Sequence, residues 1–279
     1  MKPILVFQTD FTYKEGAVAA MYGVVKSVDP SLEIIDATHE IPQYDIWSAS
    51  YRLSQYISFW PKGTIFVSVV DPGVGTKRKA CVARLKNGYY VVSPDNGTLT
   101  HINNIYGIEE VREINEDINR LKREDNKEVA IFHGRDLFGY CAARLASGII
   151  TYEQVGEKYD LSEIKLLEIE KVAKTCNSIS GIIEINDPNF GNAWSNIPLN
   201  DFKELFNYED DINVKITKNG DVLFNQKVKF VKAFGDVNKG EPLIYNNELG
   251  KLSLALSQGS FMEKYHVYYG NDYKIEFSK

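Results

Sequence analysis

Cysteine is scarce in this chain, and its pattern argues against two kinds of stabilising site. The 279 residues include three cysteines, Cys81, Cys141 and Cys176, which are far apart and form no CxxC pair. A disulfide framework needs paired cysteines and a zinc site needs closely spaced ligands, so neither is indicated. Free thiols are typical of a reducing compartment, and we expect a cytoplasmic protein without a bound metal.

Long apolar runs and an excess of positive charge are also lacking. No stretch approaches the roughly 20 apolar residues that a membrane helix needs, and "MKPILVFQTDF" lacks the apolar length and cleavage site of a signal peptide. The net charge of −6 leaves no basic excess for a nucleic-acid surface. We therefore expect neither a membrane nor a nucleic acid as a partner, while a small-molecule substrate stays open.

The first part of the chain alternates short apolar runs with segments of helical periodicity. Residues 79–97 suggest a hairpin that turns at Asn87-Gly88, and Asp45 is a good helix N-cap. This alternation predicts an α/β domain whose central, largely parallel sheet is covered on both faces. The expected strands are 4–10, 33–39, 64–75 and 129–136, and the expected helices are 15–30, 45–60 and 137–148.

The second part of the chain has the pattern of an all-β sandwich or barrel. Turn residues separate short β-like runs at the spacing typical of such folds. The expected strands are 178–187, 211–220, 227–236, 242–247, 251–260 and 273–279. We place the boundary between residues 165 and 175, which gives an α/β domain over 1–170 and a β-rich, barrel-like domain over 171–279.

Polar turns follow several of the expected parallel strands, where ligands bind in such sheets. "TDF", "DPGVGTKR", "PDNG" and "FHGRD" all take such positions. The glycines of "DPGVGTKR" allow a close backbone approach to a ligand, but the stretch is neither GxGxxG nor a P-loop. From the pattern alone it is as well explained by a plain turn, in which Asp71 could pair with Arg78.

The remaining motifs leave similar alternatives open. "PDNG" fits a β-turn by residue type, although Asn96 could present its amide to a ligand. His133 in "FHGRD" is compatible with a structural histidine as well as with a functional one. "NDPNFGNAWSNI" (186–197) is either a loop with a small aromatic cluster or an amide and aromatic pocket for a nucleoside. The chain has no G-x-S-x-G elbow, so it does not fit a serine hydrolase. It has no HExxH motif, so a metal site is poorly supported.

Taken together, these motifs resemble one family. "TDF", "WPKGTIFVSVVDPGVGT", "SPDNGTL", "FHGRDLF" and "NDPNFGNAWSNI" occur in the order seen in the S-adenosyl-L-methionine (SAM) hydroxide adenosyltransferases, relatives of the bacterial fluorinase and chlorinase. The resemblance spans nearly the whole chain. It implies an N-terminal α/β domain, a β-barrel-like C-terminal domain, and a homotrimer with active sites between the N-domain of one subunit and the C-domain of the next.

The resemblance also implies a reaction and a set of catalytic residues. The reaction is hydrolysis of SAM to adenosine and L-methionine, with SAM as the substrate and no cofactor. The family's Asp-Arg-His set falls on Asp71, Arg78 and His133. Halogenating relatives carry a tyrosine in place of this acid and a halide-holding threonine at Val74, so the chain resembles the water-using branch. The alternatives are a halide-using SAM adenosyltransferase and a protein that binds SAM or adenosine without turnover.

Substrate contacts carry over onto further positions. Asp10 belongs to the matching "TDF", Glu15 stands where halogenating relatives have a ribose-binding aspartate, and Tyr44 replaces a pocket tryptophan. The resemblance assigns Asp187 to the methionine amine and Asn192 to adenine, with Phe190, Trp194, Phe234, Ser257 and Gln258 around them. The chain departs from the family in having Thr12 for a glycine, "FGY" for "FAP" after "HGRD", and "SQG" for "NQG".

Overall fold

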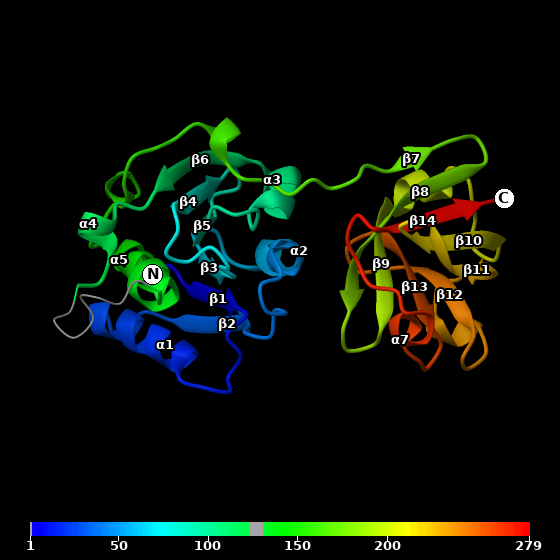
Figure 1. The fold of residues 1–279 in the computed structure, drawn as a ribbon, viewed down its shortest axis with the longest axis horizontal. Helices are drawn as coiled ribbons and strands as arrows, with labels where there is room; N and C mark the ends of the chain where they lie inside the picture. The colour runs from blue at the N-terminus through cyan, green and yellow to red at the C-terminus, as the bar shows by residue number, and fades with distance from the viewer. Residues whose placement is uncertain (1, 123–130) are drawn as a thin grey trace. The chain divides into compact units, whose positions relative to one another are not determined.

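The computed structural model describes residues 2–122 and 131–279, and the chain divides into two compact units, Met1–Leu167 and Glu168–Lys279 (Figure 1). The first unit is α/β and the second is a β-barrel, as the sequence predicts. Within the described residues, no helix has both the length and the apolar character needed to cross a membrane.

The sheet of the first unit has the strand order β2-β1-β3-β5-β4-β6 and is largely parallel. Only β4 runs against its two neighbours, because a tight hairpin turn, in which Gly88 has a φ of +91°, joins it to β5. The hairpin predicted at Asn87-Gly88 is therefore confirmed. The strands are β1 (Leu5–Thr9), β2 (Ile34–Thr38), β3 (Ile65–Val69), β4 (Ala80–Leu85), β5 (Tyr90–Pro94) and β6 (Ile108–Glu113).

Helices cover both faces of this sheet, because successive strand residues point to opposite faces and both sets are apolar. Leu5 and Phe7 of β1 pack in one buried cluster with α1 and α5, whereas Val6 packs in another with α2 and α3. Asp45 caps α2 by accepting from the Ser48 amide at 2.8 Å. The helices are α1 (Ala17–Val28), α2 (Ile46–Tyr56), α3 (Thr100–Tyr106), α4 (Glu116–Asn119) and α5 (Tyr140–Ala146), with shorter turns η1 (Ile57–Phe59), η3 (Gly134–Gly139), η4 (Glu153–Val155) and η5 (Leu161–Glu163).

The strand predicted over 129–136 is wrong in its described part. Residues 129 and 130 lie outside the described residues, and 131–136 supply no strand to the sheet. Ile131 is 74% exposed, and from Gly134 the chain winds into the π-helical segment η3, which continues into α5. The apolar run is too short to cross the sheet. Among the described residues, the last strand of this sheet is instead β6, whose one strand neighbour is β4 and whose other edge bonds to the segment around Lys158.

The second unit is a closed barrel. Its strands follow the order β14-β10-β11-β12-β13-β9-β8-β7, and β14 also pairs with β8, which closes the ring. Aliphatic and aromatic side chains such as Ile183, Val214, Phe202 and Phe277 fill its interior. The strands are β7 (Ala173–Lys174), β8 (Ser178–Asp187), β9 (Asn192–Pro198), β10 (Asp211–Lys218), β11 (Asp221–Phe230), β12 (Pro242–Asn246), β13 (Lys251–Leu256) and β14 (Tyr273–Ser278), with helices α6 (Leu199–Lys203), α7 (Phe261–Tyr265) and the turn η6 (Phe234–Asp236).

The asparagine-rich stretch 186–197 is a β-hairpin rather than a plain loop. β8 ends at Asp187 and β9 begins at Asn192, and these two residues are paired in the antiparallel ladder. The tight turn needs Gly191, whose φ is +69° and where a Cβ would lie 2.1 Å from Oγ of Ser260. The hairpin gives the polar side chains of this stretch fixed positions.

Candidate active site

The turn after β3 folds Arg78 back over Asp71. The amide of Val74 donates to the carbonyl of Asp71 at 3.2 Å, and Gly75 takes a φ of +76° that favours glycine. A Cβ on Gly73 would lie 3.3 Å from Cγ of Arg78, so the small residue leaves room for the arginine side chain. The glycines of this turn therefore serve to bring its two charged ends together.

Asp71 and Arg78 form a two-pronged ion pair that is largely shielded from solvent. Nε of Arg78 donates to Oδ1 of Asp71 at 2.8 Å and Nη2 donates to Oδ2. The arginine side chain is 10% exposed and the aspartate side chain 6%. The ring of Phe138, 5.2 Å from the guanidinium carbon, covers one face of the arginine. Such paired geometry fixes both side chains more firmly than a single contact would.

His133 joins this pair through the same guanidinium. Nη2 of Arg78 lies 2.9 Å from Nδ1 of His133, and the histidine precedes η3 at the start of the helix. Burial lowers the pKa of His133 below its ordinary value, and the charge of Arg78 lowers it further. The structure thus gathers Asp71, Arg78 and a neutral His133 from positions 7 and 55 residues apart in the chain.

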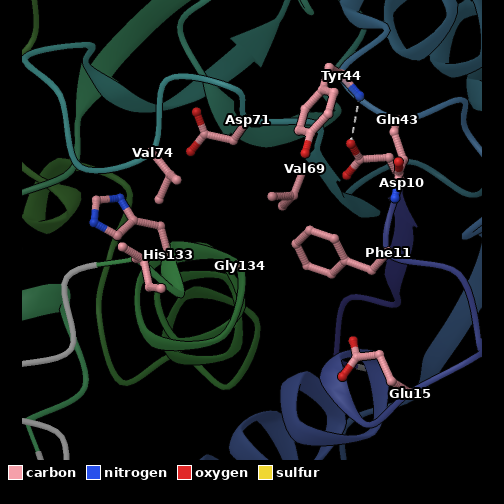
Figure 2. A pocket seen from close by; sticks show the side chains of 11 residues that line it. Asp10, Phe11, Glu15, Gln43, Tyr44, Val69, Asp71, Val74, His133 and Gly134 are labelled. Atoms are coloured by element: carbon pink, nitrogen blue, oxygen red, sulfur yellow. Dashed lines mark hydrogen bonds between the residues drawn. The ribbon is translucent and has the colours of Figure 1, made fainter.

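Asp71 and His133 line a pocket of about 380 Å³ at the carboxyl edge of the sheet, a volume within the range of small-molecule sites. Figure 2 shows Asp71, Val74 and His133 on one side and Asp10 and Tyr44 across from them, with Glu15 at the start of α1. Five further residues line the pocket and were not singled out from the sequence, although all but Gln43 lie in a quoted motif or a predicted strand: Phe11, Gln43, Val69, Ile131 and Gly134.

Asp10 is held by the backbone of the segment opposite. Its Oδ2 accepts a hydrogen bond from the amide of Tyr44 at 2.9 Å, drawn in Figure 2. Burial raises the pKa of Asp10, and the charge of Asp71 adds to the rise. Tyr44 itself has a φ of +66° and a side chain that is largely exposed. Glu15 accepts from the Ala17 amide at 3.1 Å, so it also caps the first turn of α1.

Asn96 does not line this pocket. Its Nδ2 donates to the carbonyl of Val70 at 2.9 Å, and its Oδ1 accepts from the hydroxyl of Thr98 at 2.8 Å. These bonds tie the turn after β5 to the end of β3, next to Asp71. A direct contact between Asn96 and a substrate stays a prediction.

In the second unit, Asp187 and Asn192 lie side by side across the β8–β9 hairpin. Oδ1 of Asp187 accepts from the amides of Asn189 and Phe190, and Oδ2 accepts from Nδ2 of Asn192 at 3.3 Å. The ring of Phe190, at the tip of the turn, is 72% exposed. The hairpin thus presents a carboxylate, an amide and an exposed aromatic ring together.

Next to β9, a line of aromatic side chains connects Trp194 to Phe234. Nε1 of Trp194 donates to the hydroxyl of Tyr245 at 3.0 Å, and the ring of Tyr245 packs against that of Phe234 with centroids 4.9 Å apart. Ser257 donates to the Phe234 carbonyl at 3.3 Å. Gln258, which follows, is exposed and has a φ of +55°. Tyr245, in the predicted strand 242–247, is the member of this group that sequence reasoning missed.

Within residues 2–122 and 131–279, no group of three or more histidine, cysteine, aspartate or glutamate side chains has the arrangement to hold an ion. The three cysteines are all free thiols.

Comparisons with known proteins agree across both units. The profile of the SAM hydroxide adenosyltransferase N-terminal domain matches residues 5–156, and that of the C-terminal domain matches residues 181–274. An (R)-S-adenosyl-L-methionine hydrolase from Methanocaldococcus jannaschii is 32% identical over 249 residues, covering 88% of this chain and 85% of the relative. A fluorinase from Actinopolyspora mzabensis is 24% identical over 299 residues, covering 98% and 97%.

Solved structures show the same fold. The crystal structure of an uncharacterized conserved protein from Thermotoga maritima superposes with a TM-score of 0.87 at 35% identity, covering 99% of this chain and 100% of the other.

Proposed function

Because the chain belongs to the SAM hydroxide adenosyltransferase family, we propose that it hydrolyses SAM to adenosine and L-methionine. The observation that carries the proposal is the Asp71–Arg78–His133 cluster at the wall of the pocket. Relatives that are 32%, 31% and 29% identical carry the name of this hydrolase and lend support.

The reaction we propose is an in-line displacement at the 5′ carbon of the ribose. The oxygen of a water molecule forms a bond to that carbon while the carbon–sulfur bond breaks and its electron pair stays on sulfur. Methionine leaves as a neutral thioether, so no acid is needed to protonate it. What the protein must supply is a water molecule held behind the 5′ carbon and a group that takes its proton.

Asp71 is the proton acceptor in this proposal. Nδ1 of His133 already faces a donor, Nη2 of Arg78, and the lowered pKa of His133 favours its neutral form. A neutral imidazole in this setting carries its proton on Nε2 and can donate to the water but cannot accept from it there. As the new bond forms, the water proton becomes strongly acidic, so a carboxylate suffices as the base.

Arg78 organises the set. The Nε and Nη2 donors of Arg78 hold the Asp71 carboxylate in one orientation, and Nη2 also orients the ring of His133. Because an arginine has no acceptor and stays charged, it contributes only donors to this cluster. We propose Asp71, Arg78 and His133 as the catalytic residues on this basis.

Substrate recognition is assigned to side chains of both units. We propose that Asp10, with Glu15 and Tyr44, binds the ribose side of SAM, since all three line the pocket next to Asp71. On the second unit, we propose Asp187 for the methionine amine and Asn192 for adenine. Their aromatic and polar neighbours complete the nucleoside contacts: Phe190, Trp194, Phe234, Ser257 and Gln258.

Halide is the main rival to water as the nucleophile. Fluorinases are among the relatives, at 24% and 25% identity over nearly the whole chain. Two features of the pocket disfavour a halide: the Asp71 carboxylate repels an incoming anion, and Val74 offers no hydroxyl to hold one.

Product analysis in isotopically labelled water tests the proposal. Purified protein is incubated with SAM in water enriched in ¹⁸O, with and without chloride or fluoride. The products are then separated by chromatography and their masses are determined by mass spectrometry. We expect adenosine with one ¹⁸O atom at the 5′ position, and the same yield with halide present. A 5′-halogenated nucleoside would instead establish the halide reaction, and intact SAM in the presence of measurable binding would establish a non-catalytic protein.

Assembly and location complete the proposal. On the family resemblance, we propose a homotrimer in which the N-terminal unit of one subunit and the C-terminal unit of the next share each site. A mass other than that of three subunits, measured by light scattering on the purified protein, would contradict the trimer. The free thiols fit our prediction of a cytoplasmic location.

A further inference from the structure

We propose that Asp36 and His39 form a clamp that holds the Asp10–Glu15 segment in the shape that the pocket needs. Asp36 lies in β2 and His39 follows its last residue, next to β1 in the sheet, and neither side chain lines the pocket. The segment they hold follows β1 and supplies three pocket residues. Asp36 and His39 are thus positioning residues, and their link to catalysis rests on the proposed function.

The first contact of the clamp is with the end of β1. Oγ1 of Thr9 accepts from the amide of Phe11 at 3.1 Å and lies 2.7 Å from Nδ1 of His39. The Asp36 carboxylate can only accept, so Nε2 of His39 is the ring nitrogen that donates toward it. Nε2 in turn lies 3.1 Å from Oδ1 of Asp36. His39 is fully buried, so the Thr9 end of this chain of hydrogen bonds is shielded from water, while the Asp36 side chain at the other end is 30% exposed.

The second contact holds the backbone just after Asp10. The amide of Thr12 donates to the carbonyl of His39 at 2.8 Å. Thr12 has a φ of +58°, a conformation that a β-branched side chain strongly disfavours. Such a strained residue persists only where its surroundings over-determine it. The clamp supplies that constraint.

The third contact reaches the middle of the segment. The hydroxyl of Tyr13 donates to Oδ2 of Asp36 at 2.5 Å, and its ring meets the ring of His39 edge-on with centroids 5.0 Å apart. Tyr13 is 58% exposed, so burial alone does not fix it. Glu15 follows two residues later. Asp36 and His39 therefore restrain the segment on both sides of Phe11 and before Glu15.

A matched pair of tyrosines isolates the effect of the clamp. Tyr22 also donates to Asp36, on Oδ1, and its hydroxyl lies 3.2 Å from Nε2 of His39, but it belongs to α1 and packs against the core of the first unit. Tyr13→Phe and Tyr22→Phe each remove a hydroxyl that donates to Asp36, but only the first removes a contact to the segment, since Tyr22→Phe leaves the bonds to Thr9, Thr12 and Tyr13 in place. We expect Tyr13→Phe to raise the KM for SAM about fivefold with kcat changed less than about twofold, as loss of one hydrogen bond allows. Tyr22→Phe should leave KM within about twofold.

Thr9 offers a second pair. Thr9→Val keeps the shape and removes the hydroxyl that links the Phe11 amide to His39, whereas Thr9→Ser keeps the hydroxyl. We expect Thr9→Val to raise KM about tenfold and Thr9→Ser to restore a near-normal value. Tyr13→Phe changes an exposed side chain, so it keeps the test usable if Thr9→Val does not fold.

Hydrogen exchange gives a readout that does not depend on activity. We expect the amides of residues 10–16 to exchange faster in Tyr13→Phe and Thr9→Val than in the wild type, and at the wild-type rate in Tyr22→Phe and Thr9→Ser. Unchanged exchange in the first two variants would overturn the clamp, and so would faster exchange with an unchanged KM. A wild-type protein that forms no adenosine would refute the proposed function instead, while the exchange rates would still decide whether the clamp exists.

Discussion

Nη2 of Arg78 donates a hydrogen bond to Nδ1 of His133 at 2.9 Å, while the same guanidinium holds both carboxylate oxygens of Asp71. An arginine has donors and no acceptor, so this contact requires a bare Nδ1 on the histidine. Protonation of His133 would place two donors face to face and break the contact. The organisation of the cluster therefore depends on the charge of one imidazole.

The first prediction is a pH profile. Burial and the charge of Arg78 lower the pKa of His133 from its ordinary 6.5, so the ring stays neutral as the pH falls through that value. We expect kcat/KM to be level at pH 6.5 and to fall only at lower pH. The stability from this neutral ring is likewise present above 6.5 and is lost as the pH falls through the lowered pKa.

An NMR titration of the His133 ring protons checks this directly. In Arg78→Gln the pKa of His133 should rise, because the positive charge of Arg78, which helps to lower it, is removed. Burial should still keep this pKa below 6.5. A wild-type His133 that titrates at or above 6.5 would contradict the assignment of the neutral ring.

The second prediction concerns the proposed base. Asp71→Asn keeps the shape of the side chain but removes its charge. It also replaces one of the two oxygens that accept from Arg78 with an NH2 group, which is a donor. We expect kcat to fall about 10²- to 10⁴-fold, the range for loss of a general base. Calorimetry should find adenosine affinity changed only a few-fold. Lys77→Gln, at an exposed residue of the same turn, is the control for a change of one charge and should retain normal kcat.

The third prediction separates stability from binding at Asp10. Burial and the nearby Asp71 raise its pKa, which means that ionised Asp10 costs stability once the pH exceeds its unfolded value. Asp10→Asn removes the charge and keeps an oxygen for the Tyr44 amide. We expect Tm at pH 7 to rise by about 2 °C and the KM for SAM to rise about tenfold or more. A lower Tm measured by circular dichroism would show that the carboxylate itself stabilises the fold.

The fourth prediction uses two glycines of the first unit. A Cβ on Gly134 would lie 2.9 Å from Cε2 of Phe11, so Gly134→Ala must displace a ring that lines the pocket. We expect a destabilisation of about 1–2 kcal/mol and a higher KM. Gly23, in α1, has no atom within 4 Å of its added Cβ, so Gly23→Ala should stabilise by up to about 1 kcal/mol. Equal effects of the two variants on KM would rule out the steric explanation.

Periodicity predicted those elements whose two faces differ or whose turns are marked. The hairpin at Asn87-Gly88 and the Asp45-capped helix are confirmed, because each has a local signal that tertiary packing does not override. β6 was missed because the buried residues of "IEEVRE", Ile108 and Val111, are three positions apart, which breaks the alternation expected of a strand, and the other four residues are charged. The apolar start of 129–136 resembles a strand, yet the described residues that follow wind into a helix.

Local sequence patterns do not predict the Asp71–Arg78–His133 cluster. Spacing alone leaves Asp71 and Arg78 as an ordinary turn pair, and nothing in the residues between them and His133 predicts the contact over 55 positions. The resemblance to a family placed the three side chains together in advance. It did not identify the Asp36–His39 contacts, because these depend on the register of β1 and β2 and on the strained backbone at Thr12.

The double pairing of β14, with β10 on one side and β8 on the other, bears on the order of events during synthesis. Every strand and helix of the first unit is translated before β8, whereas β8, which pairs with β7 and β9, must wait for Tyr273–Ser278 before it gains its third partner, β14. Until then both strands that flank the gap present unpaired backbone groups. A nascent chain of this protein would thus carry a finished α/β unit beside an open barrel, and the last strand translated in the barrel is the one that removes its exposed edges.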